Sequence, residues 1–174
     1  MNEYKTLIKN DKLQIVYMDE SMYFDVWQNS LDEDIRRFVP DEVFETLEIA
    51  KEVVDSLIEC YDSKEGPFVF SLIRNEDKAN IGYVQLVKIN DGWEVGYHIA
   101  KKYTGNGYAT EGLRLFLSLI KDSKQLDQVY GIALADNLAS KRVLIKNGFE
   151  IYFEGIDMYH GEQNKIIKSI LKFR

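Results

Sequence analysis

The chain has 174 residues, of which 45% are hydrophobic, with two prolines, eleven glycines and a single cysteine, Cys60. This length suits one hydrophobic core, so we expect residues 1–174 to form a single domain. No apolar run approaches the ~20 residues of a membrane span, and the start of the chain lacks a secretory pattern. A single cysteine cannot form an intrachain disulfide, which suits the reducing cytoplasm. Together these features predict a cytoplasmic protein that does not bind membranes.

Charge is distributed unevenly along the chain. The net charge is −7, which argues against a nucleic-acid partner because such proteins concentrate positive charge. Residues 19–65 carry a net charge of −11 and the rest of the chain +4. This division fits one region that attracts a cation and another that tolerates phosphate. Two solvated helices rich in glutamate would carry the same charges, and both interpretations stay open.

The first half of the chain predicts one strand followed by two helices. Residues 13–17 (LQIVY) are typical of a short strand, and Asp19-Glu20-Ser21 offers capping chemistry for a first helix. From Val43 to Tyr61, apolar residues recur at helical spacing with carboxylates between them, which predicts a second helix. Gly66-Pro67 ends it.

The remainder alternates between strand and helix patterns. Strands are expected at 68–73, 81–89, 93–100, 128–134, 150–158 and 165–172, and helices at 109–120 and 137–146. With the earlier elements this gives about seven strands and four helices. The sequence therefore predicts a mixed α+β domain.

A glycine-bearing loop, residues 102–112 (KYTGNGYATEG), connects a predicted strand to a predicted helix. Gly105 and Gly107 let the backbone turn tightly, so that several N–H groups point at one spot beside a helix N-terminus. This arrangement favours a phosphate or pyrophosphate. The dinucleotide fingerprint requires a small residue at Thr110, and the nucleoside-triphosphate loop requires Lys-Ser/Thr after Gly112, so neither pattern fits.

This loop resembles the acyl-CoA pyrophosphate motif of the GNAT acetyltransferases. The longer string GYHIA-(x)4-GNGYATEG, which begins at Gly96, is similar to the Rim-type branch, whose members acetylate protein N-termini and assorted small amines. Downstream, residues 137–140 (NLAS) and 147–149 (NGF) match two further landmarks of that branch, and the element order matches nearly the whole chain. The resemblance implies a GNAT-like, mostly antiparallel central sheet flanked by helices.

The resemblance also implies a reaction: transfer of an acetyl group from acetyl-CoA to a primary amine, by direct attack in a ternary complex. Glu94 stands where the family often places a base, and His98 is a second candidate on the same side of the strand. The Ser140 hydroxyl is expected to stabilise or protonate the departing thiolate. The resemblance assigns cofactor contacts to Tyr97, Ile99, Lys102, Thr104, Gly105, Asn106, Gly107, Tyr108, Ala109, Asn137 and Ser140.

The chain departs from the family pattern at three positions. Lys102 replaces the usual Arg or Gln, and Thr104 replaces a common Arg, so the affinity for the cofactor is expected to be modest. Leu144 stands where many members carry a proton-donating tyrosine, which leaves Ser140 as the acid. These departures keep open an alternative: an acyl-CoA-binding sensor or interaction module without turnover.

Several of these residues also have a structural interpretation. Asn137 suits a helix N-cap whatever the function, Ser140 suits a helix as a small residue, Glu94 suits a solvated strand, and His98 suits a satisfied structural histidine. No metal is expected, because His98 and His160 are distant in sequence and the cysteine stands alone. The acceptor, which the acidic region suggests is cationic, is either a protein N-terminus or a small amine. Monomer and homodimer both remain open.

Overall fold

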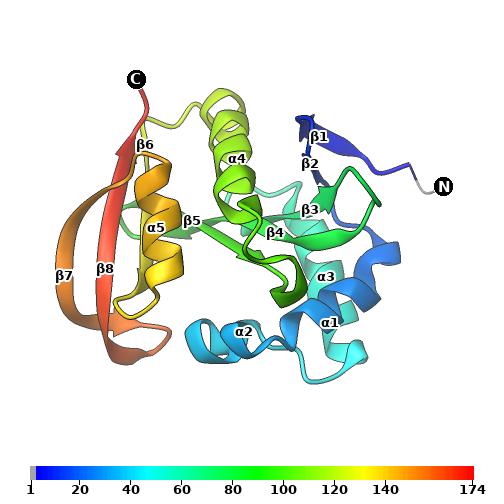
Figure 1. Cartoon of the computed structure of the whole chain (residues 1–174), viewed down its shortest axis with the longest axis horizontal. Coiled ribbons are helices and arrows are strands. Elements are labelled where there is room, and N and C mark those ends of the chain that lie inside the picture. The colour runs from blue at the N-terminus through cyan, green and yellow to red at the C-terminus, as the bar shows by residue number, and fades with distance from the viewer. Residues whose placement is uncertain (1–2) are drawn as a thin grey trace.

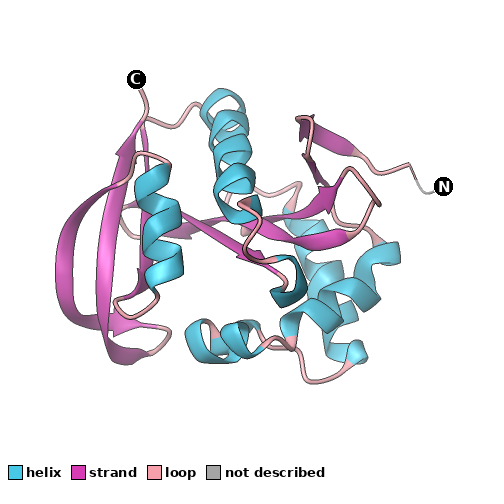
Figure 2. Cartoon of the chain, in the orientation of Figure 1, coloured by secondary structure: helices cyan, strands magenta, loops and turns pink. Residues whose placement is uncertain are grey.

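The computed structural model describes residues 3–174 and contains an eight-stranded sheet with helices on both faces (Figures 1 and 2). The strand order is β1-β2-β3-β4-β5-β6-β8-β7, and only β5 and β6 pair in parallel. The strands are β1 (Thr6–Lys9), β2 (Leu13–Val16), β3 (Phe68–Arg74), β4 (Asn80–Ile89), β5 (Gly92–Ile99), β6 (Gln128–Leu134), β7 (Glu150–Tyr159) and β8 (Glu162–Lys172).

Helices α4 and α5 cover one face of the sheet, while α1 and α3 pack on the other (Figure 1). The α-helices are α1 (Tyr23–Ser30), α2 (Glu33–Phe38), α3 (Leu47–Cys60), α4 (Tyr108–Lys124) and α5 (Leu138–Lys146). Three short 3-10 helices are η1 (Glu20–Met22), η2 (Pro40–Glu42) and η3 (Lys101–Tyr103). None of the helices within residues 3–174 combines the length and apolarity needed to cross a membrane.

Strand β3 shows why the sheet needs cover on both sides. Its residues are buried from Phe68 to Ile73, and alternate side chains point to opposite faces. Phe70 packs in the core beneath α4, which contributes a fully buried Phe116, whereas Val69 packs in a second core with Val54 of α3. Burial on both faces explains the continuous apolar run that predicted this strand.

The predicted α+β class with a mostly antiparallel sheet is confirmed, with differences at the N-terminal end. The sheet has an eighth strand, β1, and a fifth helix, α2, which the sequence patterns did not indicate. The helix expected from Val43 begins at Leu47 instead, because Pro40 starts η2 and Val43 is extended. Thr46 is the N-cap of α3, and its hydroxyl accepts a hydrogen bond from the N–H of Ile49 at 3.2 Å.

Strands β5 and β6 separate along their length. The only residues paired between them in the described part of the chain are Glu94 and Tyr130, although β5 continues to Ile99 and β6 to Leu134. Antiparallel pairing with β4 holds β5 throughout. The sheet therefore has a gap between β5 and β6 beyond Glu94.

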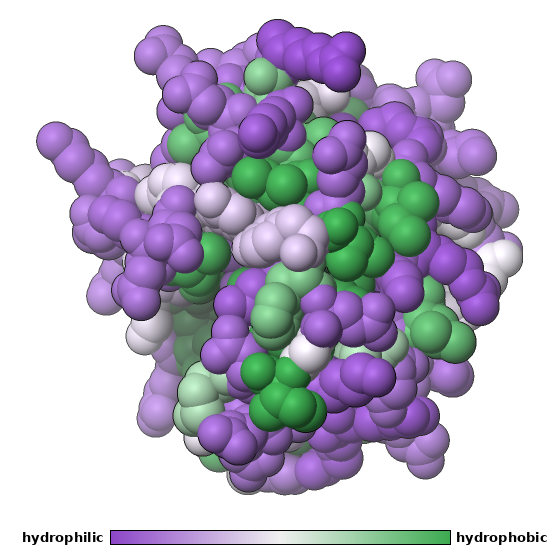
Figure 3. Space-filling view, turned by 90° about the vertical axis from the view of Figure 1, so that its left-hand side faces the viewer, coloured by the Kyte–Doolittle hydropathy of each residue, from purple (hydrophilic) through white to green (hydrophobic). Residues whose placement is uncertain are grey.

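Strand β7 forms the edge of the sheet that is opposite β1. Its side chains alternate between exposed and partly buried, and Ile156 and Met158 are among the exposed ones. Figure 3 shows this side of the molecule, where apolar side chains are scattered among polar ones. Scattered exposure of this kind is normal for a protein surface.

Candidate active site

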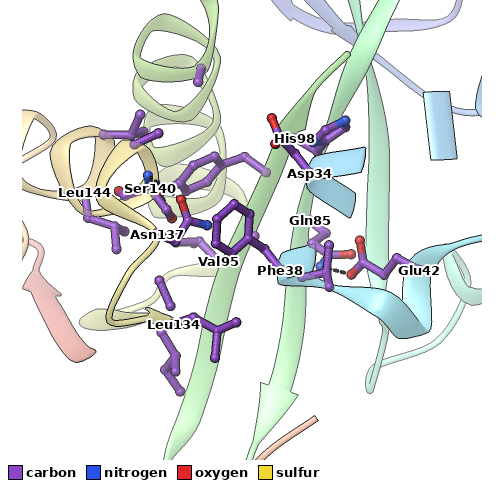
Figure 4. A pocket seen from close by; sticks show the side chains of 18 of the residues that line it. Asp34, Phe38, Glu42, Gln85, Val95, His98, Leu134, Asn137, Ser140 and Leu144 are labelled. Atoms are coloured by element: carbon purple, nitrogen blue, oxygen red, sulfur yellow. Dashed lines mark hydrogen bonds between the residues drawn. The ribbon is translucent and has the colours of Figure 1, made fainter. Parts of the chain in front are cut away.

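A cavity of about 450 Å³ lies at the gap between β5 and β6. One part of its wall comes from the α4–α5 side of the sheet, including Ala109, Asn137 and Ser140. The other part comes from α2, η2 and the far side of β5, including Glu42 and Glu94. Figure 4 shows Ser140 and Asn137 on one side, Glu42, Gln85 and His98 on the other, and Phe38 between them. The gap thus joins the two faces of the sheet in one site.

The structure brings most of the predicted site residues into this wall. The wall contains Glu94, Tyr97, His98, Ile99, Thr104, Ala109, Asn137 and Ser140. The other predicted residues, Lys102, Gly105, Asn106, Gly107 and Tyr108, belong to the adjacent loop and the first residue of α4. The wall also contains residues that sequence analysis did not single out as functional, chiefly Glu42, Tyr159 and His160.

The glycine loop presents free backbone N–H groups at its end of the cavity. Gly105 and Gly107 have φ of +81° and +78°, a left-handed conformation that side chains with a Cβ rarely adopt. Gly107 is the N-cap of α4, and the first helical hydrogen bond runs from the N–H of Glu111 to its carbonyl at 3.0 Å. The amides of residues 107–110 therefore precede the helical bonding pattern and, with the helix dipole, favour an anion.

Side chains of the loop hold its shape rather than point into the cavity. The Asn106 amide donates to the carbonyls of Tyr103 and Thr104 at 3.1 and 3.2 Å. The Thr104 hydroxyl donates to the Lys101 carbonyl at 2.8 Å. Lys102 is exposed, with its ammonium 5.0 Å from the ring centroid of Tyr103. Of these three side chains, only that of Lys102 carries a charge.

A pair of hydroxyls, one from Ser140 of α5 and one from Tyr97 of β5, lies at the N-terminus of α5. The Asn137 side chain accepts from the N–H of Ser140 at 3.1 Å, so Asn137 is the N-cap of this helix. The Tyr97 hydroxyl lies 2.9 Å from the Ser140 Oγ and also donates to the Ser140 carbonyl at 3.0 Å. Burial raises the pKa of the Tyr97 phenol, so it remains a hydroxyl at neutral pH.

Leu144, where the family often has tyrosine, is buried in the core. A Cβ added to Gly131 of β6 would lie 2.4 Å from the Leu144 Cδ2, so the leucine side chain occupies the space that this glycine leaves. The position therefore packs α5 against the sheet. The tyrosine hydroxyl closest to Ser140 in this site comes from β5, through Tyr97.

The carboxylates of Asp34, Asp41, Glu42 and Glu94 line the opposite part of the cavity, and the last two have raised pKa values. Glu94 is partly buried, and burial, followed by the negative charge of Glu42, raises its pKa to about 8. Burial likewise raises the pKa of Glu42, which accepts hydrogen bonds from the Tyr83 hydroxyl and from the Gln85 amide at 3.0 Å. Gly96 makes room for Gln85, since a Cβ there would lie 2.6 Å from its Nε2.

His98 has a structural partner. Its Nε2 lies 3.4 Å from the Asp32 carboxylate, which also accepts the N–H of Lys101 at 2.8 Å. Burial lowers the pKa of His98, while the hydrogen bond to Asp32 opposes that shift. The histidine therefore ties the start of α2 to the end of β5, and this geometry favours the structural interpretation of His98 over that of a base.

Two side-chain contacts connect the α2–η2 segment to the C-terminal half of the chain. Arg37 lies 3.0 Å from Asp136 before α5, and Asp41 lies 3.0 Å from the Nδ1 of His160 in the β7–β8 turn. In Figure 1, α2 lies between α1 and that turn. These contacts join segments more than 95 residues apart, which is why periodicity could not indicate that Glu42 and His160 line one cavity.

Comparison with known proteins identifies the family. Residues 15–150 match the acetyltransferase (GNAT) domain. YoaA of Bacillus subtilis (strain 168), an uncharacterized N-acetyltransferase, is 26% identical over 150 residues, which cover 83% of this chain and 82% of that protein.

Solved structures of the same fold are also similar. The GNAT-family acetyltransferase from Bacillus anthracis has a TM-score of 0.81 at 20% identity, covering 95% of this chain and 97% of that one. RimL, a ribosomal L7/L12 alpha-N-protein acetyltransferase, has a TM-score of 0.79 at 15% identity, covering 96% and 97%. At this identity the likeness to RimL shows a shared fold. The family match spans most of the sequence, and this chain therefore belongs to the GNAT acetyltransferases.

Proposed function

We propose that this protein transfers the acetyl group of acetyl-CoA to a primary amine by direct attack in a ternary complex. The observation that carries the proposal is the cavity through the sheet, which has a loop that favours an anion at one end and a group of carboxylates, Glu42 and Glu94 among them, at the other. A site of this size lies within the ~300–1,000 Å³ range of small-molecule pockets. The lone cysteine fits the reducing cytoplasm, where we place the reaction.

The donor binds at the glycine-loop end. The pyrophosphate rests on the amides of residues 107–110, with Lys102 as the nearby cation, and the pantetheine arm follows the unpaired edge of β5 from Ile99 toward Tyr97. RimL, which has the same fold, was crystallised in complex with coenzyme A. The thioester then lies between the Tyr97–Ser140 hydroxyl pair and Glu94, all of which line the cavity.

The acceptor binds at the carboxylate end. A primary amine of pKa ~10.4 arrives as an ammonium ion, and Glu94 and Glu42 are the charges that offset its desolvation. The acidic region 19–65 supplies α2 and η2 on this side and favours the approach of a cation. Either a protein N-terminus or a small amine satisfies this chemistry.

The reaction requires three proton transfers: one from the ammonium, one to the departing thiolate and one from the nitrogen after the attack. The Glu94 carboxylate takes a proton from the ammonium, directly or through water, and the free amine attacks the thioester carbonyl carbon. An N–H of β5 beyond Glu94 stabilises the oxyanion. As the tetrahedral intermediate collapses, the C–S bond breaks, and the Tyr97–Ser140 pair donates a proton to the departing thiolate. The nitrogen, which is positively charged after the attack, loses its second proton through water to the deprotonated pair, and Glu94 releases its proton to solvent. The products are the acetylated amine, coenzyme A and one proton.

Titration calorimetry of acetyl-CoA and thiol release test this proposal in sequence. Wild type is expected to bind acetyl-CoA, whereas a folded Gly107→Trp variant loses binding because a side chain there obstructs the backbone amides. Wild type is then expected to release coenzyme A only when a primary amine is added. Binding without release for every amine would support a sensor, and no binding at all would refute the acetyltransferase proposal.

A further inference from the structure

A second cavity, of about 340 Å³, lies on the acceptor side of the sheet beneath α1, α2 and α3. Its wall is mainly apolar and includes Met18, Ile35, Phe44, Val53 and Leu57. The cavity is distinct from the donor end of the active site, because no residue of the glycine loop or of α5 contributes to it.

The polar residues in this wall make hydrogen bonds with their neighbours. The Ser30 hydroxyl donates to the Trp27 carbonyl at 2.8 Å and accepts the N–H of Phe44 at 3.1 Å. The Asn29 amide donates to the Asn80 carbonyl at 3.2 Å, and the Asn80 amide donates to the Ser71 hydroxyl at 3.2 Å. With these groups satisfied, the wall offers a ligand chiefly apolar contacts.

The two cavities share part of their walls. The shared residues are Asp41, Glu42, Tyr83, Gln85, Val87 and His98. At this junction Glu42 accepts hydrogen bonds from Tyr83 and Gln85, which hold its carboxylate in place. A molecule whose ammonium lies near Glu42 and Glu94 is therefore adjacent to the apolar cavity.

We infer that the second cavity holds an apolar substituent of the acceptor, so that the substrate class is a primary amine carrying a bulky aliphatic or aromatic group. The inference rests on the proposed function and narrows it. A substituent in this cavity exchanges water for apolar wall, which favours binding. A second cation in the apolar part of this cavity, away from Asp41 and Glu42 at the junction, would lose its hydration without a charged partner, so polyamines are poor acceptors.

Matched amino-acid amides test this inference, because they share one amine and differ in the side chain. The rate of coenzyme A release with glycinamide, leucinamide, phenylalaninamide and lysinamide gives kcat/KM for each. Leucinamide or phenylalaninamide is expected to exceed glycinamide by at least about tenfold, since one methylene in a hydrophobic pocket is worth about that factor. Lysinamide is expected to lie below leucinamide.

Two substitutions on α3, one in the cavity wall and one outside it, locate the effect. Val53→Trp fills the cavity and is expected to bring the leucinamide-to-glycinamide ratio close to one. Ile49→Trp, one turn earlier at an exposed position outside the cavity, keeps the wild-type ratio. Acetyl-CoA affinity reports whether each variant is folded. Should Val53→Trp not fold, Phe44→Ala enlarges the cavity and is expected to raise the phenylalaninamide-to-leucinamide ratio several-fold.

The outcomes separate this inference from the function on which it rests. Equal kcat/KM for glycinamide and leucinamide, a preference for lysinamide, or a Val53→Trp ratio like that of wild type would overturn the inference and leave the acetyltransferase proposal intact. Failure to acetylate any amine while binding acetyl-CoA would overturn both. A comparison of 3-methylbutylamine with a peptide that begins with leucine then distinguishes a small amine from a protein N-terminus, and faster turnover of either supports the apolar site.

Discussion

Substitution of Glu42 is expected to change the pH at which the enzyme becomes active. In the proposed mechanism Glu94 acts as a base only when ionised, and with a pKa of about 8 it is about one-tenth ionised at pH 7. The value of kcat/KM should therefore rise about tenfold above pH 7 and level off above the pKa. Because the charge of Glu42 contributes to the raised pKa, Glu42→Gln lowers that pKa, and the rise moves to lower pH.

The assay measures kcat/KM for one acceptor amine at saturating acetyl-CoA, from about pH 6 to about pH 9.5. The amine also titrates, so the informative quantity is the difference in midpoint between wild type and variant with the same acceptor. Glu45→Gln is the matched control, since this substitution removes the same charge from an exposed ion pair with Arg36. Glu94→Gln should lower kcat/KM by about 10²–10⁴ and abolish the Glu94-dependent part of the rise.

Three results would refute this reasoning. An unchanged midpoint in Glu42→Gln would show that the two carboxylates are not coupled, and an equal displacement in Glu45→Gln would show only a general charge effect. Full activity in Glu94→Gln would remove Glu94 as the base and return attention to His98 or to water alone.

Three further predictions follow from the geometry. Tyr97→Phe and Ser140→Ala should each lower kcat, and the double variant should lose less than the sum of their free-energy effects, because the hydroxyls act as a pair; additive losses in steady-state kinetics would separate their roles. Gly131→Ala should lower the free energy of unfolding by about 1–3 kcal/mol in urea denaturation, since the new methyl displaces Leu144, and an unchanged value would contradict that packing. Glu94→Gln should gain thermal stability relative to wild type as the pH rises from about 5 to about 8. The pKa of Glu94 is raised in the folded protein from 4.5 to about 8, so wild type loses stability across this range, whereas glutamine does not titrate. A Tm difference independent of pH would argue that Glu94 titrates normally.

Local signals in the sequence predicted much of the fold and one end of the site. The helical period of α4 and the glycine pair before it depend on neighbouring residues, so they could be recognised without a structure. Strand β1 escaped notice because it has four residues and a mostly polar neighbourhood at a sheet edge. Helix α2 has six residues between Asp32 and Val39, too few to show a period.

The acceptor end of the site could not be predicted in the same way. Glu42 and Glu94 are 52 positions apart, and one carboxylate among fifteen in the acidic region carries no local mark. Their proximity depends on the path of η2 across the sheet, which the contact between Asp41 and His160 holds in place. It also depends on Gly96, which leaves space for the Gln85 side chain that donates to Glu42. Thr46 did offer a usable signal, because a threonine before an apolar helical period marks the true start of α3.

The gap in the sheet has a kinetic consequence. Because the cavity takes its walls from both faces, donor and acceptor reach the reacting centre from different directions, and neither must leave before the other enters. A relay through an acylated cysteine is unnecessary, and Cys60, at the end of α3, lines neither cavity. Initial rates at varied concentrations of both substrates should therefore give intersecting rather than parallel double-reciprocal lines. A single molecule that joins coenzyme A to the amine should occupy both approaches at once.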